Sequence, residues 1–301
     1  MSLGSSRGMA LLSVLWITGL LAVMAASFAS STRTEARLAH NLMENAKAEA
    51  LADGGVERAV LGLFELDPQI AWRPGGGAYA IALGEGEVRI EIEDEDGKID
   101  LNGAPLELIA GLLAVLGLAP DQAQAMAERI GDYRDYDDEP APQGAEDPDY
   151  FAAGLMAGAA DREFATVAEL LGVLGMTQAL YEGMRPFVTV YSGGEGVDLT
   201  RARRAVLEAL PGMTPALVEQ LQSAGPDFDL FEAVEDESLL EQIELYFLPT
   251  RDVVFTVRAL ARTAGGGIFL REAVIELGGT DERPYVVHAW RRGALPTGLA
   301  G

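Results

Sequence analysis

Cysteine is absent from this sequence of 301 residues, and histidine and lysine occur only twice each. The absence of cysteine excludes disulfides, thiolate catalysis and cysteine-ligated zinc. The two histidines, His40 and His288, leave little material for a multi-histidine metal site or a Ser-His-Asp triad. The sequence also contains no phosphate-binding glycine loop, nucleophile elbow or metalloprotease helix. We therefore predict that the protein is not an enzyme.

Positive charge of any kind is scarce. The chain has 47 acidic and 22 basic residues and a formal net charge of -25. Nucleic acids and anionic membrane surfaces are bound through clustered lysine and arginine, so both are poor partners for such a chain. Cations are better candidates. Hydrophobic residues make up 49% of the sequence, which is enough for a packed core.

A long uncharged segment stands near the N-terminus. It runs for 21 residues from Met9 to Ala29, and the single cation Arg7 precedes it. As a helix it would be about 30 Å long, enough to cross a bilayer core. Arg7 on the short side favours a cytoplasmic N-terminus, which places the bulk of the chain outside that membrane. The alternative is a secretory signal peptide cleaved after Ala29, because Ser27 and Ala29 are small residues at the required spacing.

The helical pattern continues beyond the uncharged segment. Apolar residues recur at three-to-four-residue and two-turn intervals, with charged residues between them, which predicts one helix from the membrane to about Leu66. Gly54 and Gly55 are a possible bend. A signal peptide needs no such extension. The apolar positions are Leu38, Leu42, Ala46, Ala50, Val56, Val60 and Phe64.

Alternating apolar and polar residues predict strands in two separate parts of the chain. About 150 residues of helical character lie between the two sets. The predicted fold class is α+β, with the long N-terminal transmembrane helix packed on a small antiparallel sheet and a large, mostly helical domain inserted between strands. The predicted strands are 79–83 and 88–92, joined near Gly84 and Gly86, and then 253–260, 268–277 and 284–290.

Within the inserted region, helices are predicted at 105–116 and 120–129, after Thr166 in a capping box, and after the N-cap Thr214. Residues 101–130 and 198–224 each resemble a helix-hairpin-helix unit, which usually binds the DNA backbone. No lysine or arginine follows the second hairpin loop before Arg251. We therefore interpret both units as packing scaffolds.

The segment from Asp132 to Tyr150 holds eight acidic residues among nineteen. Such a loop either stays open and solvated or closes around cations. Calcium fits this composition, because it takes six to eight oxygen ligands and tolerates irregular loops. A carboxylate pair such as Asp135 and Glu146 is also the best case for a glycosidase, although nothing in the sequence fixes their separation. The predicted calcium ligands are Asp135, Asp137, Asp138, Glu139, Glu146, Asp147 and Asp149.

A second acidic segment runs from Asp94 to Asn102. Its glycine, Gly97, stands fourth rather than sixth as in an EF-hand loop, and no glutamate closes the segment at the twelfth position. We interpret it as a strand-ending turn, with Asn102 as a cap of the helix that follows Pro105.

The N-terminal features together resemble a type IV prepilin-like protein: a short polar leader that ends in Arg7-Gly8, then an uninterrupted apolar helix that continues as an amphipathic stem. The resemblance implies that a prepilin peptidase cleaves after Gly8 and that Met9 becomes N-methylated. Most members carry a glutamate at the fifth mature position, where this chain has Ser13. That departure and the large insertion are similar to the K-type minor pseudopilins of type II secretion systems, although Ser13 is also interpretable as a tolerated small polar residue in a span.

The K-type resemblance implies a minor pseudopilin at the tip of the secretion pseudopilus, which initiates filament assembly and supports export of folded proteins across the outer membrane. Its implied partners are the I- and J-type minor pseudopilins, the major pseudopilin and the prepilin peptidase, and its implied location is the Gram-negative inner membrane, in a single pass with the bulk periplasmic. It also implies calcium in the inserted domain. The alternatives are a minor pilin of a type IV pilus and a membrane-tethered calcium-dependent binding protein.

The predicted division of the chain follows from the span, the strands and the resemblance. It comprises a prepilin leader at 1–8, a transmembrane segment at 9–29, a pilin-like α/β domain at 30–100 and 248–292, an inserted helical domain at 101–247 and a flexible tail at 293–301.

Overall fold

A computed structural model describes residues 6–67, 69–75, 77–224, 237–280 and 283–295. Its first element, α1 (Ser6–Leu63), is a single helix of 58 residues. The apolar N-terminal window of α1 has a mean hydropathy of 2.1 and is 0% buried, and among the described residues α1 is the one helix long and apolar enough to cross a membrane. The helix ends three residues before the predicted Leu66.

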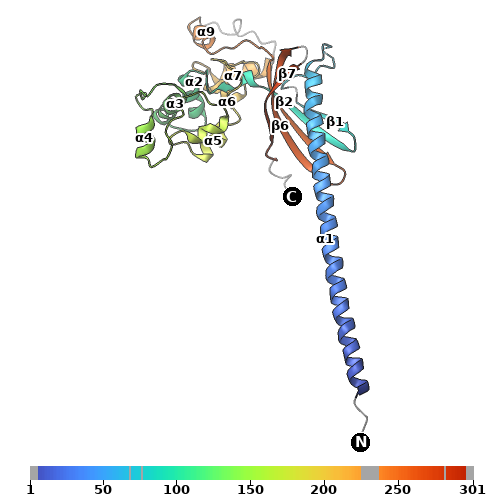
Figure 1. Cartoon of the computed structure of the whole chain (residues 1–301). Coiled ribbons are helices and arrows are strands. Elements are labelled where there is room, and N and C mark those ends of the chain that lie inside the picture. Colours follow the sequence, from blue (N-terminus) through green and yellow to red (C-terminus); the bar gives the residue numbers. More distant parts are fainter. Residues whose placement is uncertain (1–5, 68, 76, 225–236, 281–282, 296–301) are drawn as a thin grey trace.

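The C-terminal part of α1 lies on one face of a five-stranded antiparallel sheet (Figure 1). The spatial order of the strands is β1-β2-β5-β6-β7, so β5 pairs with β2 although the whole inserted region separates them in sequence. The strands are β1 (Ala78–Leu83), β2 (Gly86–Asp94), β5 (Val254–Thr263), β6 (Ile268–Thr280) and β7 (Arg283–Arg292).

Small side chains let α1 approach the sheet closely. Ala52 and Val56 are buried in the same hydrophobic cluster as Val88 on β2. A Cβ atom on Gly55 would lie 2.7 Å from Val88 Cγ1 and 3.1 Å from the Cβ of Ala259. Gly55 is therefore a point of close contact, and the helix continues through it without interruption.

Charged groups add a second connection between α1 and the sheet. Arg271 on β6 is 7% exposed, and its Nε and Nη2 atoms donate to Asp53 Oδ1 at 2.6 Å and Glu49 Oε1 at 2.7 Å. Because both carboxylates lie on α1, this pairing fixes the position of the helix along the sheet.

The inserted region lies beside the sheet, on the side away from α1 (Figure 1). It begins with η1 (Glu95–Gly97) and β3 (Ile99–Asp100), and β3 pairs in parallel with β4 (Val188–Thr189). The remaining elements described are α2 (Leu106–Val115), α3 (Pro120–Arg134), α4 (Asp147–Ala152), η2 (Val167–Gly172), α5 (Gln178–Met184), α6 (Arg204–Ala209), α7 (Pro215–Ala224) and α9 (Glu237–Glu244).

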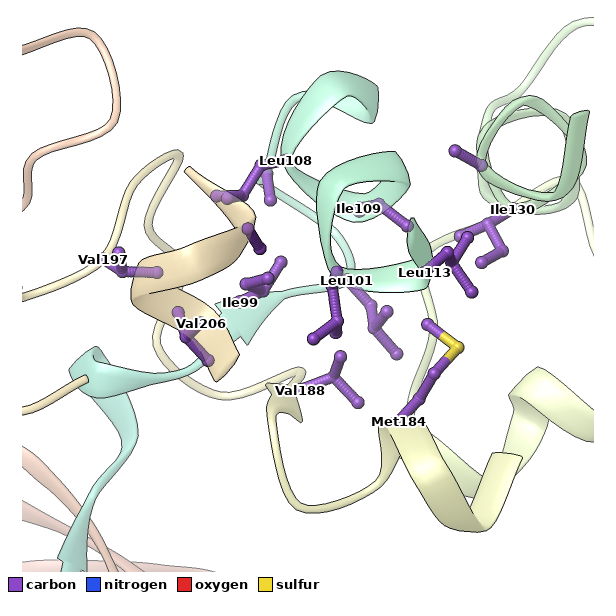
Figure 2. Packing of buried hydrophobic residues seen from close by; sticks show 14 of the residues in the cluster. Ile99, Leu101, Leu108, Ile109, Leu113, Ile130, Met184, Val188, Val197 and Val206 are labelled. Carbon is purple, nitrogen blue, oxygen red and sulfur yellow. The ribbon is translucent and has the colours of Figure 1, made fainter. Parts of the chain in front are cut away.

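The inserted region has a hydrophobic core of its own. Figure 2 shows Leu108 and Ile109 of α2 packed between α3 and α6, beside Ile99 of the short strand β3. All three side chains are 0% exposed. The helices α2 and α6 touch at Gly111, where a Cβ atom would lie 2.0 Å from the carbonyl oxygen of Ala209.

The fold class predicted from the sequence is confirmed, because the chain leaves the sheet after β2, builds a mostly helical region and returns at β5. Two helix predictions within the inserted region are wrong. The residues after Thr166 form the short 3-10 helix η2, and the Thr166 side chain makes no capping bond. The first helix of the hairpin unit predicted at 198–224 is reduced to α6, because the buried Asp198 accepts bonds from Thr200 instead of continuing a helix.

Candidate functional site

The predicted calcium segment joins the end of α3 to the start of α4. Asp132, in the last turn of α3, is 3% exposed and accepts backbone N–H bonds from Ala145 at 2.7 Å and Ala141 at 3.2 Å. A carboxylate that accepts backbone N–H groups holds a loop in place without any cation. The loop is therefore folded back over the end of α3 and is not an open solvated chain.

Three carboxylate oxygens in this region are buried without a hydrogen-bond partner: Asp135 Oδ1, Glu146 Oε1 and Asp161 Oδ1. Glu146 as a whole is 3% exposed. Buried carboxylate oxygens normally have partners, since an unpaired one costs its full desolvation energy. Three such oxygens in one region are available to a ligand that supplies positive charge.

The electrostatics of this carboxylate cluster agree with that interpretation. Burial first, and then the negative charges of Asp132, Asp135, Asp161 and Asp138, raise the pKa of Glu146 to about 7. Burial and neighbouring carboxylates likewise raise the pKa values of Asp135 and Asp161. Like charges held together disfavour ionisation, and a bound divalent cation would reverse that effect.

The chemistry of the donor set suits calcium, because it consists of hard oxygen atoms on an irregular loop. In the part of the chain that the structure describes, no three carboxylate or imidazole groups converge closely enough to hold a metal ion as they stand. Binding would therefore require the side chains of the cluster to turn inward. The unpaired oxygens of Asp135, Glu146 and Asp161 are those that would gain most from doing so.

The predicted ligands fall into two groups. Asp135, Asp138 and Asp147 lie close enough to Glu146 or Asp161 to raise the pKa of that carboxyl group. Asp137 likewise raises the pKa values of Asp132 and Asp135, although it is exposed and already accepts the N–H of Glu139 at 2.9 Å. The other two lie at the edge of the cluster: Glu139 is exposed, and Asp149 accepts the N–H of Glu146 at 3.1 Å within the capping box of α4.

Sequence reasoning missed two members of the cluster, Asp132 and Asp161. Asp132 belongs to the acidic segment but was assigned no ligand role, although a carboxylate in the last turn of a helix has a reason to face a following loop. Asp161 follows an apolar stretch and stands apart from the acidic run. Its only local signal is a backbone φ of 51°, which the sequence does not reveal.

The second acidic segment, Asp94 to Asn102, forms a different kind of site at the junction of sheet and insertion. The predicted strand-ending turn is confirmed as η1, but Asn102 caps no helix: its side chain bonds the backbone N–H and carbonyl of Phe164 at 2.8 and 3.0 Å. Glu95, 2% exposed, accepts the Thr256 hydroxyl at 2.6 Å and pairs with Lys98.

Asp96 of the same junction is 1% exposed and accepts the Nε of Arg251 at 3.0 Å. Asp100, also 1% exposed, accepts the Ser192 hydroxyl at 3.0 Å and the Gly193 N–H at 2.8 Å. Protein groups thus satisfy Glu95, Asp96 and Asp100, and these three carboxylates connect the insertion to the sheet. Asp94 Oδ2, in the same segment, is buried without a hydrogen-bond partner.

The processing site predicted at Gly8 and Met9 lies in the first turns of α1, and the side chains of both residues are outside the described part. Residues 1–5 of the predicted leader are outside it entirely. Ser13 lies in the exposed N-terminal part of α1.

Known proteins resemble this chain in sequence and in fold. Residues 91–193 match the family model of the type II secretion system, protein K. The type II secretion system protein K of Pseudomonas aeruginosa is 30% identical over 141 residues, which cover 44% of this chain and 42% of that protein. The protein of the same name from Dickeya chrysanthemi is 33% identical over 108 residues, which cover 35% of this chain and 27% of that protein.

The structural comparison extends further along the chain. A chain in the crystal structure of the GspK-GspI-GspJ complex from the enterotoxigenic Escherichia coli type 2 secretion system superimposes with a TM-score of 0.62. The match covers 88% of this chain and 100% of that one at 20% sequence identity, which establishes a shared fold. By sequence, this chain spans less than half the length of the curated relatives it matches. These comparisons confirm the resemblance predicted from the sequence: residues 91–193 of this chain are similar to the family model of the type II secretion system, protein K, and two curated proteins of that name are similar in sequence.

Proposed function

We propose that this chain is a minor pseudopilin that occupies the tip of a type II secretion pseudopilus, where it assembles with pseudopilins of the I and J types, initiates the filament and supports export of folded proteins. The observation that carries the proposal is the fold match along 88% of the chain to a chain of a GspK-GspI-GspJ complex. In this role the protein is a structural component without catalytic activity.

The arrangement of α1 supports a role in assembly. The side chains of residues 11–34 in its N-terminal half are exposed; Leu11, Trp16 and Phe28, for example, are 75%, 77% and 76% exposed. In water such a surface is unfavourable by about 25 cal/mol for each Å² of apolar area. Lipid in the membrane and the stems of neighbouring subunits in a filament would both cover it.

The position of the insertion supports a place at the end of a filament. It lies beside the sheet at the far end of the molecule from the N-terminus of α1 (Figure 1). A subunit whose head is widened at that end can pack its stem against subunits below it, whereas the wide head leaves little room for subunits above. The absence of a stem carboxylate at Ser13 fits the same end position, because no cation of a neighbour is then required.

We propose the topology that Arg7 favours, with the N-terminus in the cytoplasm of a Gram-negative cell and the bulk in the periplasm. Cleavage after Gly8 by prepilin peptidase would leave the span in place. The first test is the mass and N-terminal residue of the protein recovered from membranes with and without the peptidase. A peptidase-dependent, N-methylated Met9 is expected, and an intact leader or a start at Ser30 would exclude the pseudopilin proposal.

A matched pair of glycine variants sharpens that test. Gly8→Val should block processing and secretion, because it alters the residue at the cleavage site. Gly19→Val, at a position with open space around its Cα, should be processed normally. Co-purification of the mature protein with I- and J-type pseudopilins is expected, whereas co-purification with type IV pilus subunits alone would assign the chain to a pilus.

We further propose that the carboxylate cluster binds calcium through Asp135, Asp138, Glu146, Asp147 and Asp161. A divalent cation there would neutralise the mutual repulsion of these groups and hold the α3–α4 loop closed. Because calcium would bind only the folded state, saturation at 100 times the Kd should add about 2.7 kcal/mol to the stability.

Calorimetric titration of calcium into the chelator-treated full chain tests this proposal. Glu146→Gln should weaken binding about tenfold or more, because it removes a charged ligand. Glu182→Gln is the control: Glu182 is half exposed and bonded to Gln178 on α5, outside the cluster. Equal binding by both variants, or no binding by the wild type, would assign the cluster a purely structural role.

A further inference from the structure

A groove of about 900 Å³ separates the sheet from the inserted region, on the face of the sheet opposite α1. Strands β2, β5 and β6 form its floor, and α5 with the segment around β4 forms the facing wall. Neither the carboxylate cluster nor the apolar stem contributes to it.

The groove is basic although the protein is strongly acidic. Of its 24 lining residues eight are arginine or lysine and three are glutamate, against 22 basic and 47 acidic residues in the whole chain. More than a third of the cations of the protein are thus concentrated in one concavity. The basic lining residues are Arg89, Lys98, Arg185, Arg203, Arg258, Arg262, Arg291 and Arg292.

The cations of the floor fall into two classes. Arg258 is half-buried and paired with Glu93 Oε2 at 3.1 Å and Glu272 Oε2 at 2.9 Å, so it supports the sheet itself. Arg89 and Arg262 are exposed, on the same face as Arg258 and in neighbouring register positions of β2 and β5. Among the residues that the structure describes, Arg89 forms one ion pair, with the exposed Glu91 at 3.2 Å, and Arg262 forms none.

The spacing of these arginines suits a peptide with carboxylates at regular intervals. Arg89 lies opposite Leu260, so its diagonal neighbours across the strands are Arg258 and Arg262, about 7–8 Å away. Alternate side chains of an extended peptide point the same way and stand at about that interval. Guanidinium groups form bidentate hydrogen bonds with carboxylates, which favours arginine in the recognition of acidic side chains.

Apolar groups alternate with the cations. Leu260, Leu270 and Val274 line the floor, and Tyr181 and Tyr191 line the wall. A phosphate or other small anion would use none of these side chains, whereas a peptide of mixed acidic and apolar residues would bury its apolar side chains on them. Aromatic and arginine side chains together are also the composition typical of binding surfaces on proteins.

We propose that this groove binds an extended acidic peptide segment of a partner protein, whose carboxylates pair with Arg89 and Arg262 and whose apolar side chains contact Leu260, Leu270 and Tyr181. This binding site shares no lining residue with the carboxylate cluster or the apolar stem.

The test is fluorescence anisotropy with the full chain in detergent and a labelled eight-residue peptide of alternating glutamate and leucine. The matched peptide with glutamine in place of glutamate should not bind. The Arg89→Glu and Arg262→Glu double variant should bind the acidic peptide about 10- to 100-fold more weakly, and the wild-type affinity should fall as salt rises.

The control carries the same change in charge elsewhere: Arg33→Glu with Arg37→Glu, two exposed positions of the α1 stem, should bind like the wild type. An equal loss of peptide affinity in both double variants would show that the peptide is attracted by the overall charge of the protein, and it would overturn the proposal. Binding of phosphatidylglycerol vesicles without peptide binding would assign the groove to a lipid surface. If thermal unfolding shows that the charge reversals disturb the fold, Arg89→Gln with Arg262→Gln tests the same contact, and unchanged peptide affinity there would overturn it.

Discussion

The two acidic clusters of the inserted region differ in what faces their carboxylates. At the junction with the sheet, Asp96 and Glu95 are buried against Arg251, Lys98 and the hydroxyl of Thr256. In the carboxylate cluster between α3 and α4, the charges that act on Glu146 are those of other carboxylates. Glu95, Asp96 and Glu146 are all buried, yet among the described residues only Glu95 and Asp96 form ion pairs with cations of the protein.

The difference separates a connection of the fold from the site at which we propose a cation. Protein cations and hydroxyls fix the junction, so the insertion should stay attached to the sheet whatever ions the solvent contains. The groups of the carboxylate cluster repel one another, so under the proposed calcium binding its loop would respond to cations in the solvent. Calcium should therefore stabilise the region from α3 to α4 without changing how the insertion docks on the sheet.

The largest effect is expected from breaking the junction. Arg251→Met would leave the buried Asp96, 1% exposed, without its cationic partner and should cost about 3–5 kcal/mol of the free energy of unfolding. Urea unfolding measures the loss, which should be the same in calcium and in chelator. Arg162→Met, which removes the exposed pair with Glu169, should cost about 1 kcal/mol or less. A similarly small loss for Arg251→Met would mean that the junction is not held by this ion pair.

The next effect concerns pH in the absence of calcium. The pKa of Glu146 is raised from 4.5 to about 7, so between these values the folded chain holds a proton that the unfolded chain releases. Stability from this group is therefore present at low pH and lost as pH rises toward 7 and beyond. Glu146→Gln should remove that loss and stabilise the chelator-treated protein at pH 8 by on the order of 2–3 kcal/mol.

With calcium present, Glu146→Gln should instead lower the stability, because the variant lacks one carboxylate that would bind the ion. Asp94→Asn is the control from the junction: burial raises the pKa of Asp94 to about 7 as well, so this variant should also be stabilised at high pH. Its gain should be the same with and without calcium. A gain for Glu146→Gln that calcium leaves unchanged would remove the distinction between the two clusters.

Much of the fold was predictable because it follows from local periodicity. The apolar run of α1, the alternating strands and the acidic loop are patterns within short stretches of sequence. The junction was not predictable, because Asp96 and Arg251 are 155 residues apart and each looks like an ordinary surface charge. The same holds for Asp161, which enters the carboxylate cluster only through the folding of the chain between α4 and η2. Local capping patterns also failed where tertiary contacts prevailed, as at Thr166 and Asn102.

A smaller effect should follow from removing one neutral donor at the junction. Thr256 is 4% exposed, and its hydroxyl donates to Glu95 at 2.6 Å. Thr256→Val keeps the shape but leaves the buried carboxylate one donor short, which should cost about 1–2 kcal/mol. Thr34→Val, on the exposed stem, should change stability very little. Thermal unfolding in calcium and in chelator compares the two, and a calcium-dependent loss for Thr256→Val would contradict the independence of the clusters.

The smallest effect distinguishes two predicted ligands at the start of α4. Asp149 accepts the N–H of Glu146 as part of a capping box, so Asp149→Ala should cost about 1 kcal/mol equally in calcium and in chelator. Asp147 adds to the charge around Asp161, so Asp147→Ala should lower stability in calcium and raise it slightly in chelator. A loss for Asp149→Ala confined to calcium would make it a ligand after all, and the boundary of the carboxylate cluster would then include the first turn of α4.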